Sequence, residues 1–140
     1  MKEKIKVIAY IIRTKDSRDE VLVFTHRDFP EAGLQVVGGT VDPGENQKDA
    51  LLREIKEESG LVFKAQDILK KLGETQYLRK DIAEINLRHY YVLKGGDLPD
   101  SWSHTVVSNG LDNSLVFDFY WMPFSLAKNE LTGNFGELLP

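Results

Sequence analysis

The chain of 140 residues has no cysteine, which excludes disulfide bridges and thiolate zinc sites and gives no hint of secretion. It has no basic excess either, because 18 Lys and Arg against 22 Asp and Glu leave a net charge of −4. Without a basic run, stable nucleic-acid binding through phosphate neutralisation is not expected. The apolar run VIAYII at residues 7–12 is far shorter than the roughly 20 residues of a membrane helix. We therefore expect a soluble, cytoplasmic protein.

Hydrophobic patterns and turn residues predict a mixed α/β chain. A helix over 46–59 should begin after Asn46 as N-cap and end at Gly60, with Leu51, Leu52 and Ile55 as its apolar stripe. A short helix should start at Pro123 and reach about residue 131. The tail of residues 133–140 could dock through Phe135, Leu138 and Leu139 or fray. Strands are expected over residues 5–13 and 20–26, which would form a hairpin, and over residues 34–37, 61–64, 68–78, 82–93 and 115–122. Residues 95–114 are expected to form a long loop or an ordered insertion.

The most informative stretch is GTVDPGENQKDALLREIKEESGL, residues 39–61. Within the predicted helix, Glu54, Glu57 and Glu58 stand at i, i+3 and i+4, so their carboxylates project from one face. Like charges this close cost a bare helix roughly 0.2–0.5 kcal/mol per pair. A hard divalent cation with oxygen ligands would account for such a cluster. Mg²⁺ is the natural candidate, and Mn²⁺ is the second.

This stretch matches a known signature at every fixed position, and its members here are Gly39, Glu45, Arg53, Glu54, Ile55, Glu57, Glu58, Gly60 and Leu61. The chain resembles the Nudix hydrolase family in this respect. The resemblance implies an α/β fold, specifically an α/β/α sandwich with a mixed β-sheet formed by one domain over residues 1–140. The motif would form a loop, a helix and a second loop packed against the sheet.

The resemblance also implies a reaction. Family members hydrolyse a nucleoside diphosphate linked to another group, with water attacking a phosphorus of the diphosphate and a nucleoside monophosphate leaving. Divalent ions would neutralise the diphosphate and lower the pKa of bound water. The expected ligands are the carbonyl of Gly39 and the carboxylates of Glu54, Glu57 and Glu58. Among substrates, a nucleoside triphosphate or a dinucleoside polyphosphate is favoured over ADP-ribose or a nucleotide sugar.

The other motif residues look like support for these ligands. Arg53 can pair with Glu57 at i+4 and hold its carboxylate in place, so it is grouped with the catalytic residues. Glu45 resembles the family glutamate that braces the loop or reaches the metal through water. Gly38 and Gly39 leave room for close approach of the backbone, and Gly60 ends the helix. Val37 replaces a proline that is frequent in the family, which makes the entry to this loop less rigid.

The general base and the substrate contacts stay open at this level. Glu54 or Glu57 is the expected base, and Glu84 and Asp112 are outside candidates. Arg27 could bind phosphate, Tyr77 could stack on a base, and the segment 102–113 could close as a lid or simply cover the core through Trp102. The histidines are expected to serve packing or the surface: His26, His89 and His104.

Two other classes compete with the hydrolase. A nucleotide-sensing module on the same fold usually loses a motif glutamate, and here none is lost. An isoprenoid diphosphate isomerase would need an active-site cysteine, and the chain has none. The expected partner is a nucleotide-type small molecule, and the apolar tail with the aromatic last strand would suit a homodimer contact.

Overall fold

The sheet is built around β1 (Lys2–Lys15), whose central residues are almost all β-branched or aromatic and favour a buried strand. In this computed structural model, which describes residues 1–140, β1 turns through Asp16 and Ser17, both with positive φ, into β2 (Arg18–His26). The two strands pair antiparallel. This confirms the predicted hairpin, with strands longer than expected.

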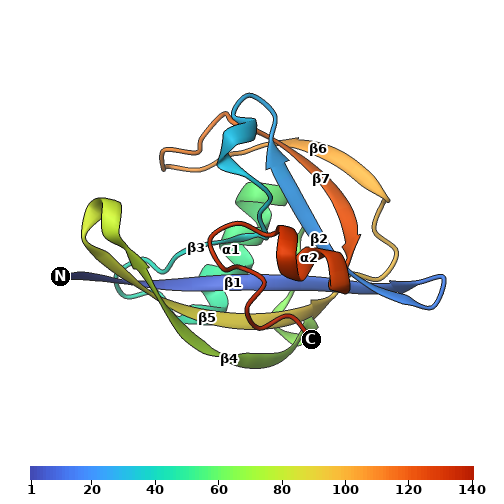
Figure 1. The fold of residues 1–140 in the computed structure, drawn as a ribbon, viewed down its shortest axis with the longest axis horizontal. Coiled ribbons are helices and arrows are strands. Elements are labelled where there is room, and N and C mark those ends of the chain that lie inside the picture. The colour runs from blue at the N-terminus through green and yellow to red at the C-terminus, as the bar shows by residue number, and fades with distance from the viewer.

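Five more strands complete the sheet: β3 (Gly38–Thr40), β4 (Ile68–Arg79), β5 (Glu84–Lys94), β6 (Ser101–Thr105) and β7 (Val116–Pro123). Their order is β4-β5-β1-β2-β7-β6, with β3 beside β1 (Figure 1). The pairing of β1 with β5 is parallel, while the other pairs are antiparallel, so the sheet is mixed as predicted.

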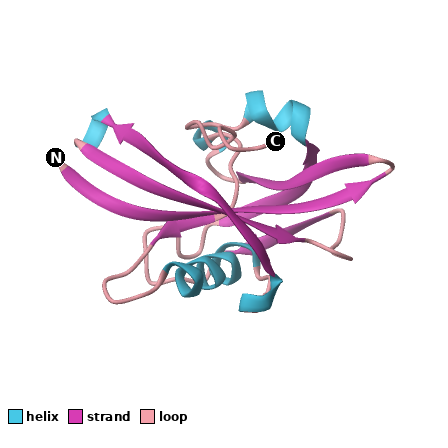
Figure 2. Ribbon diagram, turned by 90° about the horizontal axis from the view of Figure 1, so that it is seen from below, coloured by secondary structure: helices cyan, strands magenta, loops and turns pink.

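The helices cover both faces of the sheet. Figure 2 shows α1 (Gln47–Ser59) on one side and α2 (Phe124–Glu130) with the C-terminal segment on the other. Three short 3-10 turns lie in the connections: η1 (Pro30–Ala32), η2 (Ala65–Asp67) and η3 (Lys80–Ile82). This arrangement confirms the α/β/α sandwich. Neither α1 nor α2 has the length and apolar character to cross a bilayer.

Alternation along β1 produces two cores. Val7, Ala9 and Ile11 face α1 and meet Leu51 and Ile55 there. Ile8 and Tyr10 face the other side, where they meet α2 and the tail. Burying each large apolar side chain stabilises the fold by about 1.5–3 kcal/mol, so these two cores hold the helices in place.

The chain after residue 131 packs onto the second core, so of the two alternatives for the tail the structure has docking and not fraying. Leu139 is 3% exposed, and Phe135 and Leu138 pack against the same cluster. The tail is therefore used inside the molecule, and the suggested homodimer contact loses that part of its basis.

Two predicted strands are wrong. In the segment 34–37 only Leu34 and Gln35 form isolated bridges, and β3 begins at Gly38, which approaches the backbone of β1 where a side chain could not. Residues 61–64 form no strand, because Leu61 and Phe63 only pack on the first core. Of the two alternatives for the segment 95–114, the structure has the ordered insertion, since β6 pairs with β7 at the sheet edge. Leu52, expected in the apolar stripe of α1, joins neither core.

Candidate active site

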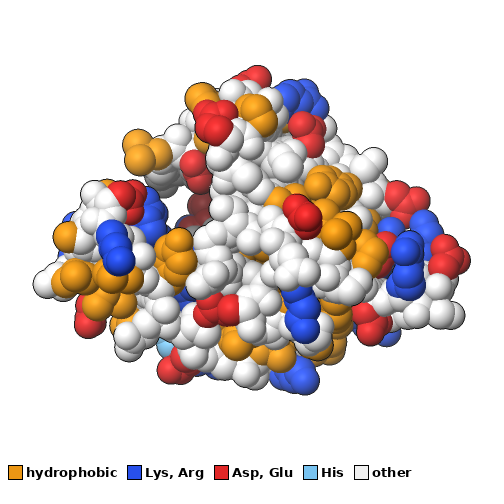
Figure 3. All heavy atoms as spheres, viewed as in Figure 1, with side chains coloured by type: hydrophobic (Ala, Val, Ile, Leu, Met, Phe, Trp, Pro, Cys, Tyr) orange, Lys and Arg blue, Asp and Glu red, His pale blue; other side chains and the backbone are white.

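A cavity of about 1000 Å³ opens beside the carboxylate edge of α1. Figure 3 shows its mouth as a hollow with acidic side chains at depth. Both α1 and the loop before it contribute to the wall, together with β1, β4, β5 and the tail. Most of the residues expected from the motif lie there: Gly38, Gly39, Arg53, Glu54, Glu57 and Glu58.

Caps at both ends fix α1 and hence its carboxylates. The Asn46 side chain accepts a hydrogen bond from the backbone N–H of Asp49 at 2.9 Å, which confirms the predicted N-cap. Gly60 ends the helix in the left-handed conformation with φ +79°, as predicted. Trp102 Nε1 donates to the carbonyl of Ser59, and His104 Nε2 lies 3.1 Å from the carbonyl of Glu57. Strand β6 thus holds the last turn of the helix.

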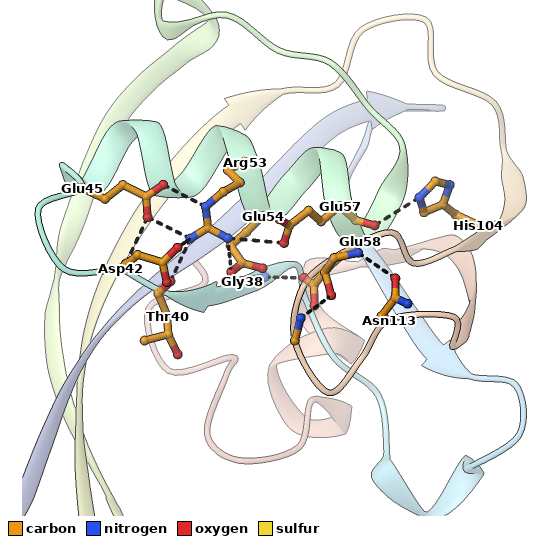
Figure 4. A network of polar contacts seen from close by, with 12 residues as sticks. Gly38, Thr40, Asp42, Glu45, Arg53, Glu54, Glu57, Glu58, His104 and Asn113 are labelled. Carbon is orange, nitrogen blue, oxygen red and sulfur yellow. Dashed lines mark hydrogen bonds and ion pairs between the residues drawn. The ribbon is translucent and has the colours of Figure 1, made fainter.

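Arg53 is the centre of the polar network shown in Figure 4. Its Nε and one terminal nitrogen donate to both oxygens of Glu45, at 2.8 and 2.9 Å. The other terminal nitrogen donates to Glu54 at 2.9 Å and to Glu57 at 3.3 Å. A further bond reaches the carbonyl of Thr40 at 3.0 Å. Arg53 therefore ties α1 to the loop before it, and its contact with Glu57 is the longest of these bonds.

Glu45 braces the loop directly. One of its oxygens also accepts the backbone N–H of Asp42 at 3.0 Å, and the pKa of Glu45 is lowered mainly by its bonds to Arg53. Of the two roles considered for this residue, the geometry displays bracing. Glu45 lies behind Arg53 and Gly60 lies at the helix end, so neither lines the cavity.

Glu58 is a buried carboxylate and Glu54 is a half-buried one, and each has few hydrogen-bond donors. Glu58 is 8% exposed and accepts one bond from the backbone N–H of Gly38 at 3.0 Å; burial raises its pKa well above the usual range. Burial also raises the pKa of Glu54 to about 7, against the opposing effect of Arg53. Removing an anion from water without full compensation is costly. Both groups would therefore gain from a nearby positive charge.

The donor set suits a hard cation, because all available side-chain ligands are carboxylate oxygens. As the side chains lie, no three Asp, Glu or His residues converge as ligands, since Glu54 and Glu57 are turned toward Arg53. Gly39 sits directly against Glu54, and a Cβ there would overlap its carboxylate. The close contact between the Gly39 backbone and the half-buried carboxylate of Glu54 fits the predicted ligand pair.

The residues proposed outside the motif divide into two groups. Tyr77 and Asp112 line the cavity, as does the stretch 108–112 of the suggested lid. Arg27 does not line it, because it pairs with Asp118 at 2.7 Å on the surface. Glu84 does not line it either; it is buried 3.7 Å from the ammonium of Lys4. Trp102 stacks on Phe119 and so covers the core.

The remaining side chains near the motif have structural contacts. His26 packs on Phe117, His89 lies beside Lys71, and His104 meets α1, so no histidine lines the cavity. Val37 is buried in the first core, and its carbonyl accepts the N–H of Ala9 at 2.8 Å. The loop entry is thus held by a strand-like bond and by packing.

Sequence reasoning missed one whole wall of the cavity. It consists of side chains on one sheet face and of the tail: Lys4, Lys6, Arg79, Asn86, Arg88 and Phe135. A signal existed in the alternation of β5, where Glu84, Asn86 and Arg88 share a face. These polar residues are buried at 5%, 5% and 3% exposure, the reverse of what their polarity suggests.

A three-layer sandwich with a glycine loop facing helix carboxylates defines the class of Nudix-type pyrophosphohydrolases. The chain belongs to the Nudix family, because the model of the NUDIX domain matches residues 3–138. This match confirms the resemblance carried by the motif. No curated protein matches the chain by sequence.

Solved structures agree on the fold. The NUDIX domain of NrtR from Shewanella oneidensis, complexed with ADP ribose, has a TM-score of 0.69 at 16% identity, over 99% of this chain and 85% of that one. An Ap4A hydrolase from C. elegans has a TM-score of 0.64 at 19% identity, over 97% and 92%. A MutT/nudix family protein from Enterococcus faecalis has 0.64 at 21%, over 88% of this chain and only 44% of that longer one.

Replacing Arg53 by Lys should lower kcat by roughly tenfold to a hundredfold, the range found when residues that orient catalytic ligands are changed. A lysine ammonium cannot grip both oxygens of Glu45 while also reaching Glu54 and Thr40. KM should change less than kcat. Steady-state kinetics with a thermal melt would measure this, and an unchanged kcat would show that the network does not orient the carboxylates.

Proposed function

We propose that the chain hydrolyses the diphosphate bond of a nucleoside diphosphate linked to another group, in a metal-dependent reaction that releases a nucleoside monophosphate. The observation that carries this proposal is the meeting of Glu54, Glu57 and Glu58 with the Gly38–Gly39 loop in one cavity. We further propose that residues 1–140 act as one domain, since the walls of that cavity come from both ends of the chain.

Mg²⁺ or Mn²⁺ would be held by the three glutamates and the carbonyl of Gly39, and when bound it would neutralise the diphosphate and lower the pKa of water. Glu54 and Glu57 would then turn away from Arg53, which would keep its two hydrogen bonds to Glu45. Arg53 would hold the loop in place while the two carboxylates exchange Arg53 for the metal ion. That division of roles follows from its five bonds.

A general base must reach the attacking water within the cavity. Glu54, Glu57 and Asp112 all line the cavity and stay candidates. Glu84 is set aside because its carboxylate is buried beside Lys4 and does not line the cavity. Arg27 is likewise set aside as a phosphate ligand, because it is paired with Asp118 and does not line the cavity.

A substrate panel tests the proposal. The chain would be incubated with nucleoside triphosphates, dinucleoside polyphosphates, ADP-ribose and nucleotide sugars, with Mg²⁺, with Mn²⁺ and with a chelator. The panel includes ADP-ribose and Ap4A, the molecules named with the NrtR domain and the C. elegans hydrolase. Release of a nucleoside monophosphate that stops on chelation is the expected result. Tight binding without turnover would instead support the nucleotide-sensing alternative.

Replacing Glu58 by Gln tests the cation site without requiring activity. The glutamine amide keeps an acceptor for the N–H of Gly38 but cannot carry a negative charge. In chelator near pH 7 the variant should be more stable than the wild type by about 1–2 kcal/mol, because the wild type must either bury this charge or take up a proton when it folds.

In Mn²⁺ the order should reverse, because stabilisation by a bound ion depends on its affinity for the folded state. Thermal melts in chelator and in a series of Mn²⁺ concentrations measure both effects. Equal Mn²⁺ stabilisation of the two proteins would remove Glu58 from the proposed ligands.

A further inference from the structure

The cavity has two walls of opposite charge. One wall, from α1 and its neighbouring loops, carries the carboxylates: Asp42, Glu54, Glu57, Glu58 and Asp112. The other carries the cations Lys4 and Lys6 of β1, Arg79 of β4 and Arg88 of β5. We call Lys4, Lys6 and Arg79, with Asn86, the basic wall. A chain with a net charge of −4 thus places several cations in this cavity.

Strand register makes this wall one surface. Lys4 lies opposite Asn86 and Lys6 opposite Arg88 in the parallel pairing of β1 and β5. Asn86 in turn lies opposite Tyr77, and Arg79 opposite Glu84, in the pairing of β4 and β5. Residues at alternate positions share a face, so these side chains project together.

Lys6 has no carboxylate partner. Its Nζ donates to Thr40 Oγ1 at 2.6 Å, and none of the ion pairs in the structure includes it. Burial, with a smaller effect from Lys4, lowers the pKa of Lys6. Lys4 itself meets Glu84 only at 3.7 Å. The positive charge at this wall is therefore incompletely compensated, and an anion there would compensate it.

Arg88 sets the limit of the wall. Its guanidinium lies between the rings of Tyr77 and Phe135, at 4.0 and 4.1 Å, and donates to the carbonyl of Gly133 at 2.6 Å. One face of Tyr77 is thus covered by Arg88 and is not open to a nucleobase. Arg88 is 3% exposed and ties the tail to the sheet, and Arg79 is paired with Asp81 at 2.7 Å, which leaves Lys4 and Lys6 for a ligand.

Asn86 adds an independent sign of a ligand. It lines the cavity, is 5% exposed, and its Oδ1 is buried without a hydrogen-bond partner. Nearly all buried polar atoms find partners, so an orphan acceptor at a cavity wall calls for a donor from a bound molecule. A sugar hydroxyl is such a donor.

We propose that the basic wall binds a phosphate group that the substrate carries in addition to the diphosphate cleaved beside α1, with Asn86 accepting a sugar hydroxyl. This inference rests on the proposed function and names its substrate class. ADP-ribose and nucleotide sugars without a sugar phosphate are then not preferred substrates, because they carry no phosphate beyond the diphosphate. The additional phosphate has two sources: a longer phosphate chain, or a phosphomonoester on the sugar. Both present the same dianionic oxygens to Lys4 and Lys6.

Binding of base-free probes tests this without depending on turnover or on the identity of the base. Dissociation constants would be measured by calorimetry, with Ca²⁺ present, for inorganic diphosphate, inorganic triphosphate and 5-phosphoribosyl 1-diphosphate. In the wild type, at least one of the two larger probes should bind roughly tenfold tighter than diphosphate, or about 1.4 kcal/mol. If triphosphate alone binds more tightly, the additional phosphate belongs to a longer phosphate chain of the substrate. If the phosphoribosyl probe alone binds more tightly, the additional phosphate is a phosphomonoester on the sugar.

The variants Lys6→Met and Lys4→Met should each reduce this tenfold preference to threefold or less while binding diphosphate like the wild type. Lys2→Met is the matched control, since Lys2 is exposed on the same strand and does not line the cavity. Equal weakening of all three probes by Lys6→Met would assign the wall to the cleaved diphosphate itself and overturn the proposal. No preference in the wild type would also overturn it.

The test of the basic wall and the test of the proposed function can fail independently of each other. Preference for the larger probes without any hydrolysis in the substrate panel would keep the basic wall and reject the hydrolase. Hydrolysis in the substrate panel without a preference for the larger probes would keep the hydrolase and reject the basic wall. Failure of all three probes to bind would count against both.

Discussion

Replacing Glu57 by Gln should reduce kcat by at least a hundredfold while leaving the melting temperature within a few degrees of the wild type. Glu57 lines the cavity at 24% side-chain exposure, and its side chain makes a single charge contact, 3.3 Å from Arg53. Gln keeps the shape and loses the charge that a divalent ion requires. A loss of this size is expected when a group acts on the reacting phosphate through charge.

The change is measured on the substrate that the panel identifies, by steady-state kinetics across Mg²⁺ concentrations. Glu130→Gln is the matched control, because Glu130 is exposed on α2 and does not line the cavity. The control should have wild-type kinetics. Wild-type kcat in the Glu57 variant would remove this residue from both the ligands and the candidate bases.

Two neighbouring glycines should respond to alanine in opposite ways. In Gly39→Ala the new Cβ would overlap the Glu54 carboxylate, which is the end of a flexible side chain and can move. In Gly38→Ala the Cβ would lie 2.6 Å from the carbonyl oxygen of Val7, which is backbone of the central strand and cannot. Displacing a catalytic group by about 1 Å can cost a hundredfold in rate.

We therefore expect Gly39→Ala to lose about a hundredfold in kcat with a small change in stability, and Gly38→Ala to lose about 1–3 kcal/mol in the free energy of unfolding. Denaturant unfolding and kinetics on both proteins measure the split. Gly73→Ala is the control, since its Cβ would meet only Leu138 at an ordinary 3.4 Å. If Gly39→Ala instead lost as much free energy of unfolding as Gly38→Ala, its loss of kcat would be explained by unfolding, and this would contradict an active-site role for Gly39.

The sequence predicts what depends on short spacing along the chain. The caps at Asn46 and Gly60, the one-sided carboxylates of α1 and the hairpin of β1 and β2 all follow from local rules, and the structure has each of them. The model of the NUDIX domain matches residues 3–138 and so confirms the family that the motif indicates. The α/β class is also predictable from the sequence, because hydrophobic periodicity and turn residues are local patterns.

Weak local signals explain the errors. Glycines have low strand propensity, so the sequence predicts a strand over residues 34–37 and not over Gly38–Thr40, where pairing with β1 overrides propensity. Residue type alone makes Arg27 and Glu84 candidates, but their partners Asp118 and Lys4 are distant in sequence. No local pattern could show that these charges are already paired.

The sequence by itself determined the helix, its carboxylates and the family, because those depend on contacts within a few residues. Only the tertiary structure decided that Arg53 grips Glu45 more closely than Glu57, that the tail docks, and that Lys4, Lys6 and Asn86 face the carboxylates across a cavity. Strand register and packing bring those groups together from opposite ends of the chain. Charge balance and burial at such a site are properties of the assembled sheet, since no single segment contains them.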